Sequence, residues 1–148
     1  MLIYRLHRAA RAAGDYTGAL LVGGRWNPPG TGILYTAQHL SLACLEILVH
    51  LDKAQLPREY VWSSIRLSRD PAVLETTNVR ELTACQTVGQ EWAESANELA
   101  VRVRSVVILE EFNVLLNPKH REYGKLVWSN PQPFHFDPRL FTFEPQPE

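Results

Sequence analysis

The sequence feature that most limits the fold is the stretch SLACLEILVHL, residues 41–51. Ser41 is a suitable helix N-cap, and only Glu46 and His50 are strongly polar among the ten residues that follow it. A helix that is apolar around its whole circumference lies in the interior, because each of its faces needs another element to cover it. We therefore expect a central helix that carries Glu46 into the protein.

A carboxylate in an apolar environment is costly unless it is paired, hydrogen-bonded or protonated. The segment before the helix, GGRWNPPGTGILY (residues 23–35), offers Arg25 as a partner. Two interpretations remain open. Glu46 either forms a structural ion pair with Arg25, or a hydrogen bond to backbone, or it belongs to a functional site, where perturbed carboxylates also gather.

The same segment has the composition of a ligand-binding loop. Glycines such as Gly24 permit unusual backbone angles and let a ligand approach the main chain. Arg25 can hold an anion, Trp26 can stack on a ring or wall a pocket, and Asn27 begins a sharp turn. The pattern is neither a dinucleotide fingerprint nor a Walker loop, and Trp26 could equally be a core residue.

Composition favours one domain whose net charge does not suit binding to nucleic acid or to an anionic membrane. The chain has 148 residues, is 45% hydrophobic, and balances 15 basic against 16 acidic residues for a net charge of -1. We therefore expect no direct nucleic-acid or membrane binding. The histidines lack a metal-ligand spacing, and Cys44 and Cys85 are typical of core residues in a reducing compartment. With no signal peptide and no membrane-length apolar run, we expect a cytoplasmic protein without a metal.

Short strands dominate the rest of the chain. The patterns predict strands at residues 1–6, 33–37, 60–67, 100–109, 112–116, 125–128 and 134–143, further helices at 80–84 and 90–99, and a frayed tail at 144–148. These predict a single α+β domain with a mixed, largely antiparallel sheet and few helices. Arg5, in the first strand, is expected on the solvent face of a sheet edge.

The strand predicted at residues 100–109 places one hydroxyl on an apolar face. Period-two alternation puts Val101, Val103 and Ser105 on the same side. A buried hydroxyl needs a hydrogen-bond partner, which could be a nearby carbonyl group. Ser105 could instead donate to Glu46.

These residues resemble the RES domain, which is named after an Arg, a Glu and a Ser. The resemblance covers nearly all of residues 1–148 and rests on GGRWNPPGTGILYTAQHLSLACLEILVHL, LPREYVW, VRVRSVV, FNVLLNPKHREYG and PFHFDPRL. By position, the three name-giving residues correspond to Arg25, Glu46 and Ser105, with Arg5 and Tyr35 as further pocket residues. Arg104 stands where the family usually has proline, which bears on the strand geometry at Ser105.

The resemblance implies an ADP-ribosyltransferase-like fold and a toxin that forms a hetero-oligomer with an Xre-type antitoxin. It also implies that NAD+ is a substrate rather than a cofactor, consumed by hydrolysis or phosphorolysis of its nicotinamide bond. Glu46 would then stabilise the ribosyl cation, and Arg25 and Arg5 would hold the pyrophosphate. Tyr35 would stack on nicotinamide or adenine, and Ser105 would donate to Glu46 or to the nicotinamide ribose and fix its orientation. An ADP-ribosyltransferase acting on a protein and a non-catalytic binding module remain as alternatives.

Overall fold

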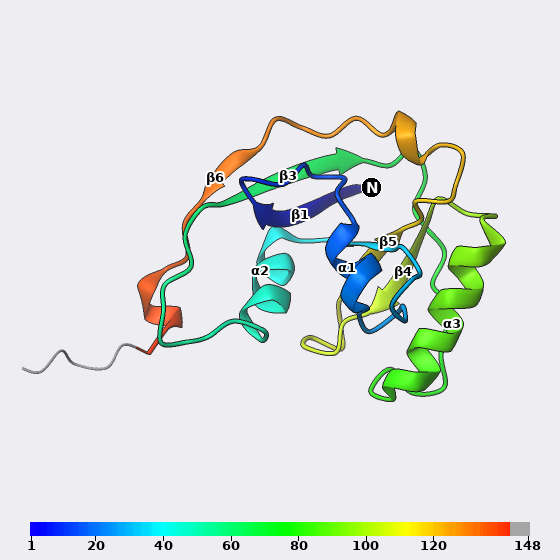
Figure 1. Ribbon diagram of the computed structural model, residues 1–148, viewed down its shortest axis with the longest axis horizontal. Helices are drawn as coiled ribbons and strands as arrows, with labels where there is room; N and C mark the ends of the chain where they lie inside the picture. The colour runs from blue at the N-terminus through cyan, green and yellow to red at the C-terminus, as the bar shows by residue number, and fades with distance from the viewer. Residues whose placement is uncertain (143–148) are drawn as a thin grey trace, which may run out of the picture.

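The computed structural model describes residues 1–142, and its centre is a six-stranded sheet (Figure 1). The strand order is β4-β5-β2-β1-β3-β6, and every neighbouring pair is antiparallel. The strands are β1 (Leu2–Arg8), β2 (Leu34–Ala37), β3 (Tyr60–Arg66), β4 (Ala100–Arg104), β5 (Phe112–Leu116) and β6 (Gln132–Phe134). The predicted α+β class is confirmed; a parallel contact occurs at an isolated bridge between Val73 and Arg102.

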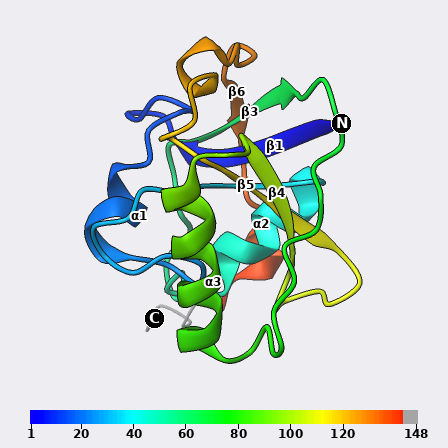
Figure 2. The ribbon, with the colours of Figure 1, turned by 90° about the vertical axis from the view of Figure 1, so that its right-hand side faces the viewer.

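Three helices accompany the sheet: α1 (Thr17–Val22), α2 (Leu40–Leu48) and α3 (Leu82–Ser95), and two single 3-10 turns, η1 (Tyr123–Lys125) and η2 (Pro138–Leu140), follow β5. Ala37 packs beneath α2, and Leu115 packs beneath α3. Ala37 pairs with Asn113, which lies two residues from Leu115, so α2 and α3 cover the same face of the sheet. Figure 2 places α3 nearest the viewer, with α1 to its left. No helix within residues 1–142 is long and apolar enough to cross a membrane.

The opposite face of the sheet is covered by irregular chain. Ile3, Leu34, Ile65 and Val114 form a buried cluster there, against which Tyr123, Leu126 and Trp128 pack. The sheet is therefore enclosed on both sides, and the two helices are confined to one of them. This arrangement leaves room between α2 and α3 on the helical face.

The sheet opens between β1 and β2. β1 pairs with β3 along its whole length but with β2 only at one position, Tyr4 opposite Ala37. Beyond this pair the two strands diverge, and residues from both, among them Leu6 and Tyr35, line a cleft. The point where these two central strands diverge therefore borders the side of the sheet that α2 and α3 cover.

Helix α2 differs from its predicted form in two respects. It begins at Leu40 after His39, and Ser41 lies exposed within its first turn without capping it. Its surface is not buried all round either, because Val49 just beyond its end is 57% exposed. The helix covers one sheet face only, so its outer side meets solvent although its sequence is apolar.

Other expected boundaries also shift. The two helices predicted at 80–84 and 90–99 are one helix, α3, and the strand predicted at 125–128 is absent, since a 3-10 turn occupies Tyr123–Lys125. β1 lies inside the sheet rather than at its edge. Of the predicted final stretch 134–143, only the start is strand; residue 143 and the tail 144–148 lie outside the described residues.

Candidate active site

A cleft of about 950 Å³ lies between α2, the 23–31 loop and the diverging strands. Its volume is within the range of small-molecule pockets, roughly 300–1,000 Å³. Much of its lining is apolar, and a few polar side chains converge on it: Arg5, Arg25, Tyr35, Glu46, Arg104 and Asn113. Four of the expected site residues, Arg5, Arg25, Tyr35 and Glu46, thus reach one cleft from four separate elements: β1, the 23–31 loop, β2 and α2.

Glu46 is half-buried on α2 and is held by two donors. Ser105 Oγ donates to Glu46 Oε1 over 2.6 Å, and Asn113 Nδ2 donates to the same oxygen over 2.7 Å. Both distances are typical of short hydrogen bonds to an ionised acceptor. The other oxygen, Oε2, has no hydrogen-bond partner within residues 1–142. One oxygen of the carboxylate is therefore fixed, while the other accepts no hydrogen bond from these residues; Glu46 itself lines the cleft.

Ser105 is fully buried, and its hydroxyl group is oriented by the chain that follows. Ser105 Oγ accepts the backbone N–H groups of Val107 at 3.1 Å and Ile108 at 3.0 Å. These two donors occupy the lone pairs of the oxygen, so its proton points to Glu46. The same turn ends β4 at Arg104, which is why the strand predicted to reach residue 109 is shorter. The contact expected between Ser105 and Glu46 is present.

Asn113 is a site residue that the sequence reasoning missed. It is the only polar residue of β5, in the run FNVLL, and lies on the helical face together with Leu115. A polar residue on the core-facing side of a strand needs a buried partner. That signal was available in the sequence, but only the fold shows that the partner is Glu46.

Arg25 lines the cleft without pairing with Glu46. Its Nη1 donates to the carbonyl oxygen of Val79 over 3.1 Å, and the ion pairs within residues 1–142 do not include it. The structural ion pair between Arg25 and Glu46 is therefore not formed. A guanidinium group and a carboxylate share one cleft instead, each held by uncharged groups.

Buried hydrogen bonds made by Asn27 and Tyr35, which we call the latch, fix the loop that carries Arg25. Asn27 is 0% exposed; its Nδ2 donates to the carbonyl oxygens of Ala19 at 2.9 Å and Thr31 at 2.8 Å. Its Oδ1 accepts the hydroxyl group of Tyr35 at 2.6 Å, and the Tyr35 oxygen accepts the N–H of Trp26 at 2.9 Å. Burial raises the pKa of the Tyr35 hydroxyl above its usual value. The phenol group thus remains a neutral donor that secures the loop.

Asn27, Trp26 and Gly24 were also expected at the site, and the structure places each of them differently. The Asn27 amide makes its hydrogen bonds within the loop and to Tyr35, and Asn27 does not line the cleft. Trp26 is 2% exposed and packs with Cys85 and Trp92 in the core, and it also borders the cleft. Gly24 is needed for close approach, since a Cβ atom there would lie 2.7 Å from the Tyr35 hydroxyl oxygen.

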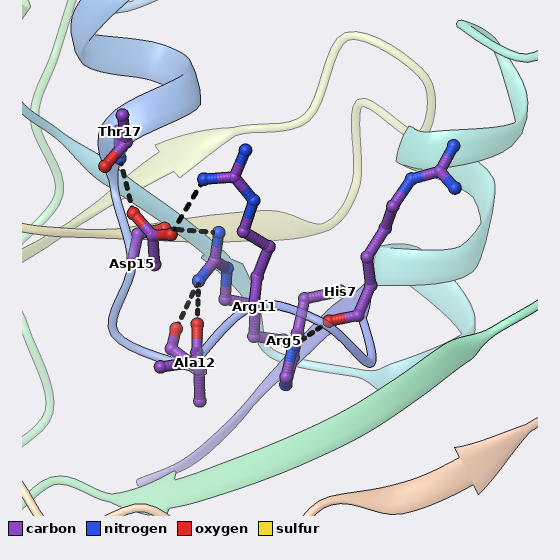
Figure 3. A network of polar contacts seen from close by, with 8 residues as sticks. Arg5, His7, Arg11, Ala12, Asp15 and Thr17 are labelled. Carbon is purple, nitrogen blue, oxygen red and sulfur yellow. Dashed lines mark hydrogen bonds and ion pairs between the residues drawn. The ribbon is translucent and has the colours of Figure 1, made fainter.

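Arg5 is also committed to the main chain (Figure 3). Its Nη1 donates to the carbonyl groups of Ala12 and Ala13, and its Nη2 donates to the carbonyl oxygen of Asp15 over 2.9 Å. Burial lowers the pKa of the Arg5 guanidinium below its usual value. Arg5 therefore lies in an interior strand and braces the loop before α1, which contradicts its expected place on a solvent-facing edge.

Arg104 does not disturb the strand at Ser105. Arg104 pairs with Phe112 in the ladder, and the Ser105 N–H continues it by donating to the Glu111 carbonyl oxygen at 3.0 Å. The Arg104 guanidinium lies 5.0 Å from the centre of the Phe112 ring and donates to the Leu109 carbonyl oxygen at 3.1 Å. The side chain thus adds a positive charge to the rim of the cleft.

The described part of the chain gathers no group of three or more His, Cys, Asp or Glu side chains that could hold a metal ion. Cys44 and Cys85 are free thiols, and burial raises the pKa of both. The cleft offers one oriented carboxylate, guanidinium groups, the His50 imidazole and aromatic or apolar walls.

Comparison with known proteins shows the family of the chain. The RES domain family model matches residues 2–137. A protein named Toxin Res from Yersinia enterocolitica is 36% identical over 151 residues, covering 95% of this chain and 99% of its own length. A protein named Prs ADP-ribosylating toxin from Sphingobium sp. is 31% identical over 134 residues, covering 83% of each.

The fold is shared with a solved structure, the M. tuberculosis MbcT-MbcA toxin-antitoxin complex. One chain of that complex superposes with a TM-score of 0.67 at 20% identity, over 94% of this chain and 85% of its own. The family match spans both Arg25 and Glu46 on the cleft as well as Ser105 behind it. The chain belongs to the RES-domain family.

Proposed function

We propose that this protein is the toxin of a toxin–antitoxin pair and that it consumes NAD+ by cleaving the bond between nicotinamide and ribose. The observation that carries the proposal is the Glu46 carboxylate on the cleft lining: Ser105 and Asn113 bind Oε1, and Oε2 accepts no hydrogen bond within residues 1–142. Relatives named Toxin Res, which align along most of the chain, support the assignment as a toxin.

The proposed reaction breaks the C–N bond between the ribose C1′ and the nicotinamide ring. The bonding electron pair leaves with nicotinamide, which departs as a neutral molecule and needs little help from a general acid. The ribose is left with oxocarbenium character, so a fixed negative charge stabilises the transition state more than the ground state. Glu46 supplies that charge through Oε2, either at the ribose hydroxyl groups or by orienting the attacking acceptor.

Arg25 is the residue we assign to the pyrophosphate. Its guanidinium reaches the cleft from the latched loop, and charge-assisted hydrogen bonds from arginine suit phosphate oxygens. Arg5 is a weaker candidate than the sequence suggested, because three main-chain carbonyl groups already occupy it. Tyr35 keeps its ring on the cleft lining while its hydroxyl group serves the latch.

A protein acceptor is the second candidate for the transfer. The Sphingobium relative carries the name Prs ADP-ribosylating toxin, which favours ADP-ribosyl transfer to a macromolecule in that protein. In the same cleft, a nucleophile on a protein would replace water or phosphate at C1′. The chemistry of Glu46 is common to all three acceptors, so the acceptor is decided by what enters the cleft.

We further propose an antitoxin partner of the Xre type and a hetero-oligomer in the cytoplasm, where NAD+ is available. The structural neighbour was solved as a toxin-antitoxin complex. Exposed apolar side chains at the cleft or close to it, Val49 and Leu82 on its lining and Leu21 and Val22 beside it, would suit such a partner.

The test is incubation of the purified protein with NAD+, with and without inorganic phosphate, followed by product identification. Free nicotinamide with ADP-ribose indicates hydrolysis, and ADP-ribose phosphate formed only with phosphate indicates phosphorolysis. Nicotinamide release that requires an added protein indicates the transferase. NAD+ that stays intact under all of these conditions contradicts the proposal and leaves a non-catalytic binding module.

A further inference from the structure

We propose that Asn113 is a positioning residue that sets which oxygen of Glu46 faces the substrate. The inference rests on the proposed function, because it assigns Asn113 a part in the reaction of that site. It concerns a residue outside the Arg, Glu and Ser that name the family. Its basis is the 2.7 Å contact from Asn113 Nδ2 to Glu46 Oε1.

Asn113 is on a rigid platform. β5 is hydrogen-bonded on both sides, and Asn113 lies opposite Ala37 of β2 and Val103 of β4. Glu46 lies on a short helix with an exposed outer side. The contact therefore ties the less constrained element to the more constrained one, and the position of the carboxylate follows the sheet.

The orientation of the Asn113 amide follows from its partner. A carboxylate only accepts hydrogen bonds, so the NH₂ group and not the amide oxygen must face Glu46. Asn113 and Ser105 approach the same oxygen from two segments, β5 and the turn after β4. A single donor would let the carboxylate rotate about its bond, whereas two donors on one oxygen fix its plane and turn Oε2 toward the cleft.

The substitution Asn113→Asp tests this role through pH. The introduced carboxyl group has nearly the size of the amide; when protonated it donates a hydrogen bond as the amide does, and when ionised it repels Glu46 at the same distance. We expect kcat for NAD+ within a few-fold of wild type at about pH 5 and at least tenfold lower at about pH 8, with KM little changed. Wild type should lack this loss.

Two further variants serve as controls, one for the loss of the donor and one for the added charge. Asn113→Ala removes the donor at every pH, so kcat should fall throughout without recovery in acid. Asn130→Asp introduces the same charge at an exposed residue that does not line the cleft, and its profile should follow wild type. A kcat for Asn113→Asp that equals wild type from about pH 5 to pH 8 would overturn the proposal.

Thermal unfolding gives a readout that does not depend on NAD+ chemistry. In the folded variant the introduced group is held protonated by its neighbour, so its contribution to stability is present at low pH and lost as pH rises. The Tm of Asn113→Asp relative to wild type should fall by at least about 3 °C between about pH 5 and pH 8. If wild type leaves NAD+ intact, the proposed function fails; if this difference in Tm is independent of pH, the contact inferred for Asn113 fails.

Discussion

Replacing Glu46 with glutamine separates a catalytic carboxylate from a structural one. A glutamine side chain has the same shape, and its amide oxygen can still accept the hydrogen bonds of Ser105 and Asn113 at Oε1. Its amide nitrogen then takes the place of Oε2, facing the cleft. The fold should therefore survive, while the negative charge at the reacting side is lost.

The expected magnitudes differ for stability and turnover. Two charge-assisted hydrogen bonds become neutral, which should lower the free energy of unfolding by about 1–2 kcal/mol and Tm by roughly 3–8 °C. A preorganised charge at a developing cation is worth about 3–4 kcal/mol, so kcat should fall by about 10²–10³-fold. NAD+ affinity should change little.

The assay is steady-state NAD+ consumption with kcat and KM determined separately, accompanied by thermal unfolding. Glu110→Gln is the matched control, because it removes one negative charge from an exposed residue near the turn that ends β4. A Glu46→Gln protein with undiminished NAD+ turnover would remove Glu46 from the mechanism. A protein that fails to fold would instead support the structural interpretation of this carboxylate.

Three further outcomes follow from other parts of the structure. Arg25→Ala should raise KM for NAD+ about tenfold or more with kcat nearly unchanged, and a loss confined to kcat would contradict the pyrophosphate assignment. Gly89→Ala should destabilise the fold by more than about 2 kcal/mol in urea denaturation, because a Cβ atom there would lie 1.8 Å from the Trp26 carbonyl oxygen; Gly124→Ala, with open space around it, should not. Burial lowers the pKa of His7, so in acid the unfolded chain binds a proton that the folded chain excludes. Stability should therefore decline as pH falls below about 6.5, and His7→Gln should flatten this decline in unfolding curves measured at several pH values.

Local sequence patterns predicted much of the fold. The strands predicted at residues 1–6, 60–67 and 112–116 match β1, β3 and β5. In YVWSSIRL the signal was the alternation of apolar and polar residues that a half-buried strand imposes. The division of α3 into two helices was wrong: Gly89 lies inside one continuous helix and allows it to pack directly on the backbone of Trp26. A glycine has the same appearance in a sequence whether it ends a helix or permits a close approach.

The placement of the charged residues was less predictable. Arg5 and Arg25 were both expected to meet anions, yet Arg5 binds carbonyl groups of the 12–15 loop and Arg25 donates to Val79. An arginine in a sequence shows that five donors are available but not which acceptors the fold brings to them. Asn27 is a similar case: it was expected to contact a ligand, but its amide makes hydrogen bonds within its own loop.

The sequence by itself determined the kinds of groups present and their order: one isolated carboxylate in an apolar helix, an arginine in a glycine-rich loop and a serine at the end of an apolar strand face. Tertiary structure decided how Glu46 is held, since its donors lie 59 and 67 residues away along the chain. Local patterns report backbone periodicity and burial, whereas a hydrogen bond needs a donor and an acceptor at about 3 Å, within a few tenths of an ångström, and only the packed sheet brings these distant segments so close.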